Sequence, residues 1–408
     1  MSKKNTNSRL VIGTLLVAST LTIMVDTALS PALPAIQDHF VDVENAAFWI
    51  RLVYVFPSLF VAIGAPILGA LIDRIGRKPV LGMSTTLYGI SGGAGFILNT
   101  IPTLLVSRAL LGLGAAGVFV AATTLIADYF PDKDRRDTVF GWQSGTSIFG
   151  GSLFFLFGGV LASINWRTPF LLYSTALALV PLIAAVLYEP DPGDHHTGHR
   201  GDDDSIRQPL RRLPLGKIML IYLIALIGMI VFFTLPIEIP FYLNHVLGAG
   251  NLLVALVLAA EALFSGLISV QYSRLRSRLN VSSIVALMFG LMGAGFVIIS
   301  LGQTIWGIMG GLFVSGAGIG LLQPNLNAWI ASDIPEDVRG RAVGCLTSSI
   351  FLGQFLSPFV SSPLSAWLGL RLTFQVGGIL MIGLGAVFLL FSWQDWVTSQ
   401  PANRSPSD

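Results

Sequence analysis

Twelve apolar runs, separated by short polar segments, dominate the sequence. As a helix rising about 1.5 Å per residue, each run can cross about 30 Å of hydrocarbon. Only 11% of the residues are charged, against about 25% in soluble domains. Because backbone polar groups within hydrocarbon must be satisfied inside helices, the pattern predicts an all-α integral membrane protein with twelve transmembrane helices. The runs lie near 10–33, 47–71, 79–98, 102–127, 138–163, 168–187, 217–243, 251–271, 281–302, 304–331, 341–367 and 371–393.

A long polar break divides the runs into two sets of six. We therefore predict a six-helix bundle over 1–187, a linker over 188–215, a second six-helix bundle over 216–395 and a tail over 396–408. The linker contains prolines, glycines and three consecutive aspartates, which are typical of a solvated connection. Its histidines (His195, His196 and His199) leave a metal site as the alternative, but we favour the solvated linker and predict no metal site within the spans.

Basic residues indicate the orientation. If Met1 lies inside, the inner segments hold 20 of the 24 Lys and Arg residues. Positive residues concentrate on the cytoplasmic side of membrane proteins. Both termini and the linker are thus predicted to be cytoplasmic, in a multi-pass protein of the plasma (inner) membrane that we expect to be a monomer.

The two halves repeat each other at an offset of 204 residues. Gly112 and Gly114 match Gly316 and Gly318, and the match continues without a gap as far as Phe170 and Phe374. Two similar halves indicate duplication, with a path between them. The expected architecture is therefore two pseudo-symmetric six-helix bundles.

A charged turn separates the second and third runs, in Gly69-Ala-Leu-Ile-Asp-Arg-Ile-Gly-Arg-Lys78. Charges this close together belong at a membrane surface, and glycines let two helix ends approach. The segment resembles the signature between helices 2 and 3 of the major facilitator superfamily (MFS). The resemblance implies the MFS fold and a conformational role for this motif. It also implies that Asp128, at the end of the fourth run, joins Asp73 and Arg77 in a charge cluster. The charged and glycine positions of the motif are Gly69, Asp73, Arg74, Gly76, Arg77 and Lys78.

Three ionisable residues within the spans are candidates for proton coupling: Asp26, Arg108 and Glu261. Such residues are costly in hydrocarbon and commonly mark a functional site. The stretch around Asp26 resembles helix 1 of the drug/proton antiporter branches of the superfamily, and that around Arg108 resembles the superfamily's helix 4 motif. Similar depths suggest that Asp26 and Arg108 pair. The alternatives are a hydrated Asp26 near the outer surface and a purely structural pair. Glu238, near the outer end of its run, is expected to be hydrated.

Uncharged polar residues and glycines within the spans form two further sets. The polar set can either contact substrate or bond helix to helix. It comprises Gln143, Gln323, Asn325, Asn327 and Gln354. The glycines Gly112, Gly114, Gly158 and Gly159 are expected to pack helices closely. In the fifth run, Phe154-Phe155 replaces the Gly-Pro of the antiporter signature, which is a departure from that branch.

No enzyme site is evident, and a Walker glycine-lysine loop is absent from the sequence. One cysteine excludes an intramolecular disulfide, and the net charge of +2 gives no indication of nucleic-acid binding. We therefore predict a non-enzymatic transporter without a cofactor, in contact with the lipid bilayer and a small-molecule substrate. The leading hypothesis is proton-coupled efflux of a small apolar or amphipathic compound. Import of a polar metabolite by a symporter or facilitator is the alternative, and a non-transporting receptor on the same fold is a third.

Overall fold

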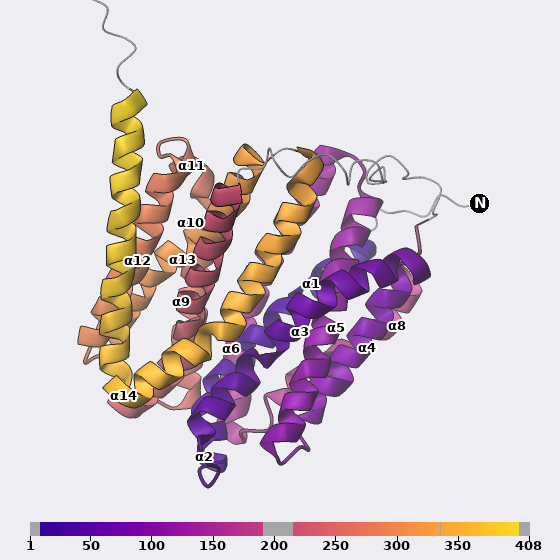
Figure 1. Ribbon diagram of the computed structural model, residues 1–408. Helices are drawn as coiled ribbons and strands as arrows, with labels where there is room; N and C mark the ends of the chain where they lie inside the picture. Colours follow the sequence, from indigo (N-terminus) through magenta and orange to yellow (C-terminus); the bar gives the residue numbers. More distant parts are fainter. Residues whose placement is uncertain (1–8, 191–214, 335, 400–408) are drawn as a thin grey trace, which may run out of the picture.

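The computed structural model describes residues 9–190, 215–334 and 336–399, and within these ranges every regular element is a helix (Figure 1). The linker predicted over 188–215 lies almost wholly outside the described residues, as do its three histidines. The last helix continues to Ser399, so it passes the boundary expected at 395.

The first half contains six membrane-spanning segments. The first is broken: α1 (Arg9–Thr27) is followed by a 3₁₀ turn, η1 (Ser30–Ala32), and by α2 (Leu33–His39). A proline is the second residue of each short element, because proline has no N–H to donate and suits the first turn of a helix. The other segments are α3 (Ala46–Ile75), α4 (Arg77–Ala94), α5 (Ile101–Tyr129), α6 (Lys133–Ile164) and a split sixth segment of α7 (Phe170–Ser174), η2 (Thr175–Ala178) and α8 (Leu179–Val186).

The second half contains the remaining six segments. The last two both lie in α14, which bends at Gly369, where φ is 77°. Because only glycine readily adopts such a φ, this residue marks the turn between two spans. The bounds are α9 (Leu215–Leu247), α10 (Asn251–Val270) with α11 (Tyr272–Arg276), α12 (Val281–Leu301), α13 (Ile305–Asp333) and α14 (Glu336–Ser399).

The structure agrees with the predicted twelve spans. Nine helical segments in the described ranges are long and apolar enough to cross a membrane, and α14 counts as one of them. Its bend at Gly369, the less apolar α4 and the split sixth segment account for the other three. The repeat is also visible in the helices, since α5 and α13 each have 29 residues and begin 204 residues apart.

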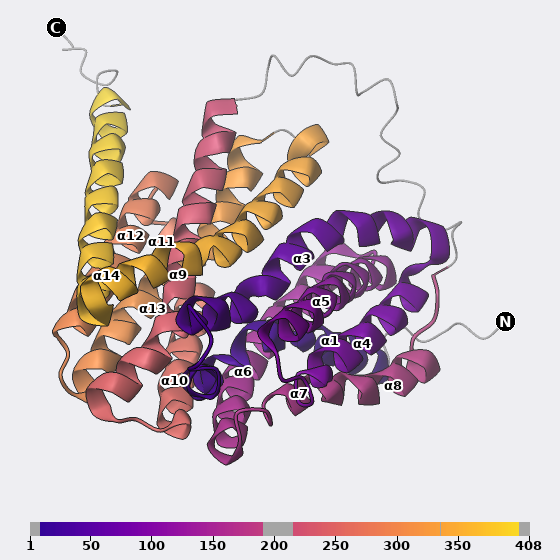
Figure 2. The same cartoon turned by 60° about the horizontal axis from the view of Figure 1, so that its bottom comes forward.

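The halves meet at one end of the molecule. We call the end where α1 begins and α14 finishes the termini end, and the opposite end the α2 end (Figures 1 and 2). One buried apolar cluster belongs almost entirely to the first half. The other joins the second half to first-half residues near the α2 end, among them Leu33, Ile50 and Trp166. The two halves therefore share a hydrophobic core at the α2 end.

Glycines allow the closest helix contacts. A Cβ on Gly112 would lie 2.3 Å from the carbonyl oxygen of Pro57, and one on Gly114 would lie 2.8 Å from the backbone nitrogen of Tyr88. On α6, a Cβ on Gly158 would lie 2.1 Å from the carbonyl oxygen of Ala28. Gly159 meets Ala255 of the other half at a similar distance. All four predicted packing glycines thus lie where a larger side chain would separate two helices.

Candidate functional site

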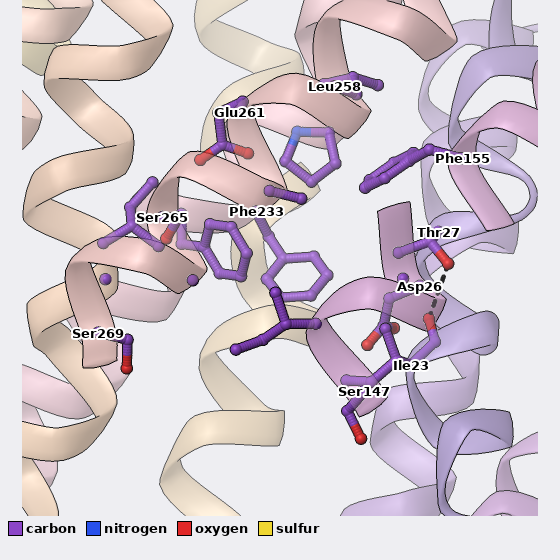
Figure 3. A pocket seen from close by; sticks show the side chains of 18 of the residues that line it. Ile23, Asp26, Thr27, Ser147, Phe155, Phe233, Leu258, Glu261, Ser265 and Ser269 are labelled. Atoms are coloured by element: carbon purple, nitrogen blue, oxygen red, sulfur yellow. Dashed lines mark hydrogen bonds between the residues drawn. The ribbon is translucent and has the colours of Figure 1, made fainter. Parts of the chain in front are cut away.

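A cavity of about 370 Å³ lies between the two halves. Its walls come from α1, α3 and α6 on one side and from α9, α10 and α13 on the other. Most of the lining is apolar, with aromatic rings from Tyr54, Phe155, Phe232 and Phe233. Two carboxyl side chains, Asp26 and Glu261, also line it. Figure 3 shows them on opposite sides of the cavity, with Phe233 between them in this view.

Asp26 lies where α1 ends, one residue before Thr27. Its Oδ1 accepts a hydrogen bond of 2.5 Å from Nε2 of Gln354, which belongs to α14 in the other half. The Tyr54 hydroxyl donates to the Asp26 carbonyl oxygen. The carboxyl is therefore both a wall of the cavity and part of a link between the two halves.

Glu261 is the carboxyl that the second half contributes to the cavity. The sequence repeat does not align it with Asp26. It is 5% exposed and packs against Gly316 of α13. Among the described residues its Oε1 has no hydrogen-bond partner. A buried carboxylate oxygen without a partner is energetically costly. A proton or a cation that reached the cavity would therefore stabilise this group.

Arg108 does not form the expected ion pair with Asp26. Its Nη2 donates to the carbonyl oxygen of Gly92 at 2.9 Å. The guanidinium lies over the rings of Phe170 and Tyr173, at 4.9 and 4.8 Å. The side chain is therefore directed toward α4 and the sixth segment, where a carbonyl and two aromatic faces stabilise the cation. Arg108 is also absent from the cavity lining, so its predicted place there is wrong for this conformation.

The five predicted polar residues divide by role. Only Gln323 lines the main cavity. Gln143 donates to Ser19 of α1, and Asn325 accepts from Tyr272 of α11, so both bond helix to helix. Gln354 is the partner of Asp26, whereas Asn327 is exposed and lies outside the cavity lining.

A buried ion pair at the α2 end was not predicted. Arg51 of α3 donates to both carboxylate oxygens of Glu238 of α9, each at 2.9 Å. Ser361 of α14 also donates to Glu238, and the Arg51 guanidinium lies over the ring of Phe241. Glu238 is 0% exposed, so the expectation that it is hydrated is wrong. Its position between Pro236 and Pro240 was the only local signal, and it did not reveal a partner in the other half.

The other described hydrogen bonds between the halves also lie at mid-depth or toward the α2 end. The Ser30 hydroxyl donates to the carbonyl of Pro236, and the Asn251 amide donates to the carbonyl of Ala162. With the Arg51–Glu238 pair and the shared apolar core, these contacts close the α2 end.

The charged motif is anchored within the first half. Arg77 forms an ion pair with Asp128 at 3.0 Å, as the cluster hypothesis expected. Asp73 and Arg74 are exposed. Asp73 makes no hydrogen bond or ion pair with the described residues, so this conformation does not place it in the cluster. The Nζ atom of Lys78 donates to the carbonyl of Ala184 on α8.

Glu189 completes this motif and was not recognised in the sequence. Its two carboxylate oxygens accept from the backbone N–H groups of Arg77 and Lys78, at 2.7 and 2.8 Å. A carboxylate at the start of α4 satisfies free donors and is stabilised by the helix dipole. Gly76 directly precedes α4 and has a φ of +98°. A Cβ on Gly76 would lie 2.6 Å from Oε1 of Glu189. Gly69, by contrast, has open space around it, so the close approach expected there is absent in this conformation.

Clusters of three or more potential metal ligands are absent from the part of the chain that the structure describes. The polar side chains that line the cavity carry carboxyl, amide and hydroxyl groups.

Comparisons with known proteins give a consistent picture. The family model described as Major Facilitator Superfamily matches residues 15–280 and 221–407. The tetracycline resistance protein, class E, of Escherichia coli is 26% identical over 398 residues, which cover 92% of this chain and 93% of that protein. The multidrug resistance protein MdtG of Proteus mirabilis is 24% identical over 378 residues, which cover 90% of this chain and 89% of that protein.

Solved structures share the fold. A bacterial homolog of the human lysosomal transporter Spinster, in an inward-facing and unoccupied conformation, superimposes with a TM-score of 0.76. It is 16% identical, and the match covers 100% of both chains. A D-xylose-proton symporter gives a TM-score of 0.75 at 16% identity, covering 93% of this chain and 96% of that one.

Proposed function

Because the chain belongs to the Major Facilitator Superfamily of membrane transporters, we propose that it exports a small amphipathic compound in exchange for protons, by alternating access. The two halves would rock about the cavity between them, so that it opens to one side of the membrane at a time. Transporters of this family are not enzymes, and the proton gradient would supply the energy.

One observation carries this proposal: each half contributes one carboxyl to a largely apolar cavity. Asp26 comes from α1 and Glu261 from α10. A carboxyl away from water can carry a proton, and it exchanges that proton when its surroundings change. The aromatic and aliphatic walls suit an apolar or amphipathic compound better than a sugar, whose hydroxyl groups need many hydrogen-bond partners.

The closed α2 end supports an assignment of the conformation. If the termini end lies in the cytoplasm, as the basic residues predict, the contacts at the α2 end close the outer side. The conformation is then the inward-facing state, which takes up substrate from the cytoplasm. The similarity to a tetracycline resistance protein and to a multidrug resistance protein supports export as the direction of transport.

A flux assay tests this proposal. The purified protein would be reconstituted into proteoliposomes, and uptake of a panel of amphipathic compounds and sugars would be measured with a pH gradient of either sign. We expect at least one amphipathic compound to accumulate on the more acidic side, because protons flowing out drive it in. Accumulation of a sugar on the less acidic side would instead establish the importing symporter. Transport that does not depend on the pH gradient would establish a facilitator.

A further inference from the structure

We infer that the central cavity selects an aromatic organic cation, and that Glu261 is the carboxylate that neutralises its charge. This inference rests on the proposed function, since it names the class of compound that the same cavity would carry.

The charges around the cavity favour a cation. Asp26 and Glu261 are the carboxyls among its described lining residues, and none of those residues is Lys, Arg or His. The two nearby arginines are engaged elsewhere: Arg51 binds Glu238, and Arg108 binds the carbonyl of Gly92. An anionic compound would therefore find no opposite charge in the cavity, whereas a cation would find two carboxyls.

The two carboxyls are not equivalent. Asp26 already accepts a hydrogen bond from the amide of Gln354. Glu261 is almost as deeply buried as a core residue, and its Oε1 has no partner among the described residues. An unpaired buried carboxylate is costly, and a nearby positive charge removes most of that cost. Glu261 is therefore the carboxyl with most to gain from a cationic ligand.

The fold does not require a carboxyl at this position. Under the offset of 204 residues, Glu261 corresponds to Pro57 and Gly316 to Gly112. The glycine meets the corresponding residue in both halves, but Gly112 meets the backbone of Pro57, whereas Gly316 meets the side chain of Glu261. Because the first half packs here through the backbone and without any charge, the helix contact alone does not require an acid at this position.

The remaining walls match an aromatic cation. Phe232 and Phe233 of α9 and Phe155 of α6 line the cavity together with Tyr54. Ring faces attract cations and also stack on aromatic groups. The cavity volume of about 370 Å³ accommodates a compact two-ring compound.

Equilibrium binding tests the inference without any ion gradient. Two radiolabelled probes of nearly equal shape would be dialysed against the purified protein: a biphenylmethyl trimethylammonium cation, and its neutral isostere with carbon in place of nitrogen. We expect the wild type to bind the cation at least about tenfold more tightly than the isostere. Equal binding of the two probes, or binding of neither, would overturn the inference.

Variants then assign the charge recognition to Glu261. Glu261→Gln should reduce cation affinity about tenfold or more and leave the isostere unaffected. Glu261→Asp should keep the preference for the cation, which also covers the case in which the amide variant folds poorly. Glu44→Gln removes an exposed acid that does not line the cavity and should change nothing. A Glu261→Gln protein that still prefers the cation would refute the role of Glu261.

The outcomes also separate this inference from the proposed function. Proton-driven transport of a neutral compound, together with equal binding of the two probes, would support proton-coupled export and refute the selection of a cation. Selective binding of the cation without any gradient-driven flux would support the cation site and refute proton-coupled export.

Discussion

At the scale of single residues, the turn between α3 and α4 depends on Gly76. Its φ of +98° and ψ of 164° fall in a region that only glycine readily adopts. The Glu189 carboxylate occupies the space that a side chain would need. Gly69 belongs to the same motif, but it has neither constraint in this conformation. The two glycines therefore form a matched pair for testing what the motif requires.

We predict that Gly76→Ala destabilises the protein more than Gly69→Ala does. The backbone strain alone costs about 1–3 kcal/mol, and displacing Glu189 leaves donors at the start of α4 without a partner. Thermal unfolding of the two variants in the same detergent, followed by tryptophan fluorescence, measures the difference. Equal unfolding temperatures would contradict the account of this turn.

The two aspartates of the motif give a second comparison. Asp128 pairs with Arg77, whereas Asp73 is exposed and makes no hydrogen bond or ion pair with the described residues. Asp128→Asn should therefore lower the free energy of unfolding by roughly 0.2–1 kcal/mol, as expected for a partly exposed pair, and Asp73→Asn should leave it unchanged. If Asp73→Asn nonetheless abolishes flux at normal stability, Asp73 acts in another conformation. A larger loss of stability in Asp73→Asn than in Asp128→Asn would show that the observed pairing is not the one that matters.

At the scale of helices, the Arg51–Glu238 pair joins α3 to α9 and thus holds the α2 end closed. Both side chains are almost fully buried. Removing one partner of a buried pair leaves an uncompensated charge, which costs roughly 3–5 kcal/mol. The cost falls on the closed state alone if opening exposes the remaining charge to water. Breaking the pair should therefore shift the population toward a state that is open at this end.

We predict that Glu238→Gln increases the distance between the halves at the α2 end. Spin labels at Ile164, where α6 ends, and at Trp306, where α13 begins, would report it in a Cys345→Ser background, since Cys345 is exposed. Lys217→Ala is the control, because it removes an exposed pair within the second half. An unchanged distance distribution in Glu238→Gln would exclude the pair as a latch.

Helix positions were predictable from the sequence, whereas the polar contacts deep within the spans were not. Apolar runs fix where each span lies, because hydrocarbon leaves the backbone no other partner. Depth in the membrane also follows from counting residues, which is why Asp26 and Arg108 were expected to pair. Counting does not give the rotation of a helix about its axis, and α5 directs Arg108 toward α4. Similarly, Arg51 and Glu238 are 187 residues apart, and no local pattern connects them.

At the scale of the whole molecule, two halves share a hydrophobic core at the α2 end and enclose a cavity with one carboxyl from each half. Asp26 links the two roles, because its bond to Gln354 crosses between the halves. We propose that this bond breaks and water reaches the carboxyl when the halves separate. Protonation of Asp26 would in this way be tied to conformation, which is the requirement for proton-coupled transport.

The most direct test of this central claim is transport by Asp26→Asn in proteoliposomes, measured in two modes at equal protein content. The account predicts that the variant still exchanges substrate down its own gradient. It also predicts that an imposed pH gradient no longer drives accumulation, whereas the wild type accumulates substrate up to about tenfold for each pH unit, which is the limit that one-for-one exchange with a proton sets. Accumulation by Asp26→Asn at the wild-type level, driven by protons alone, would contradict the claim that Asp26 couples protons to transport.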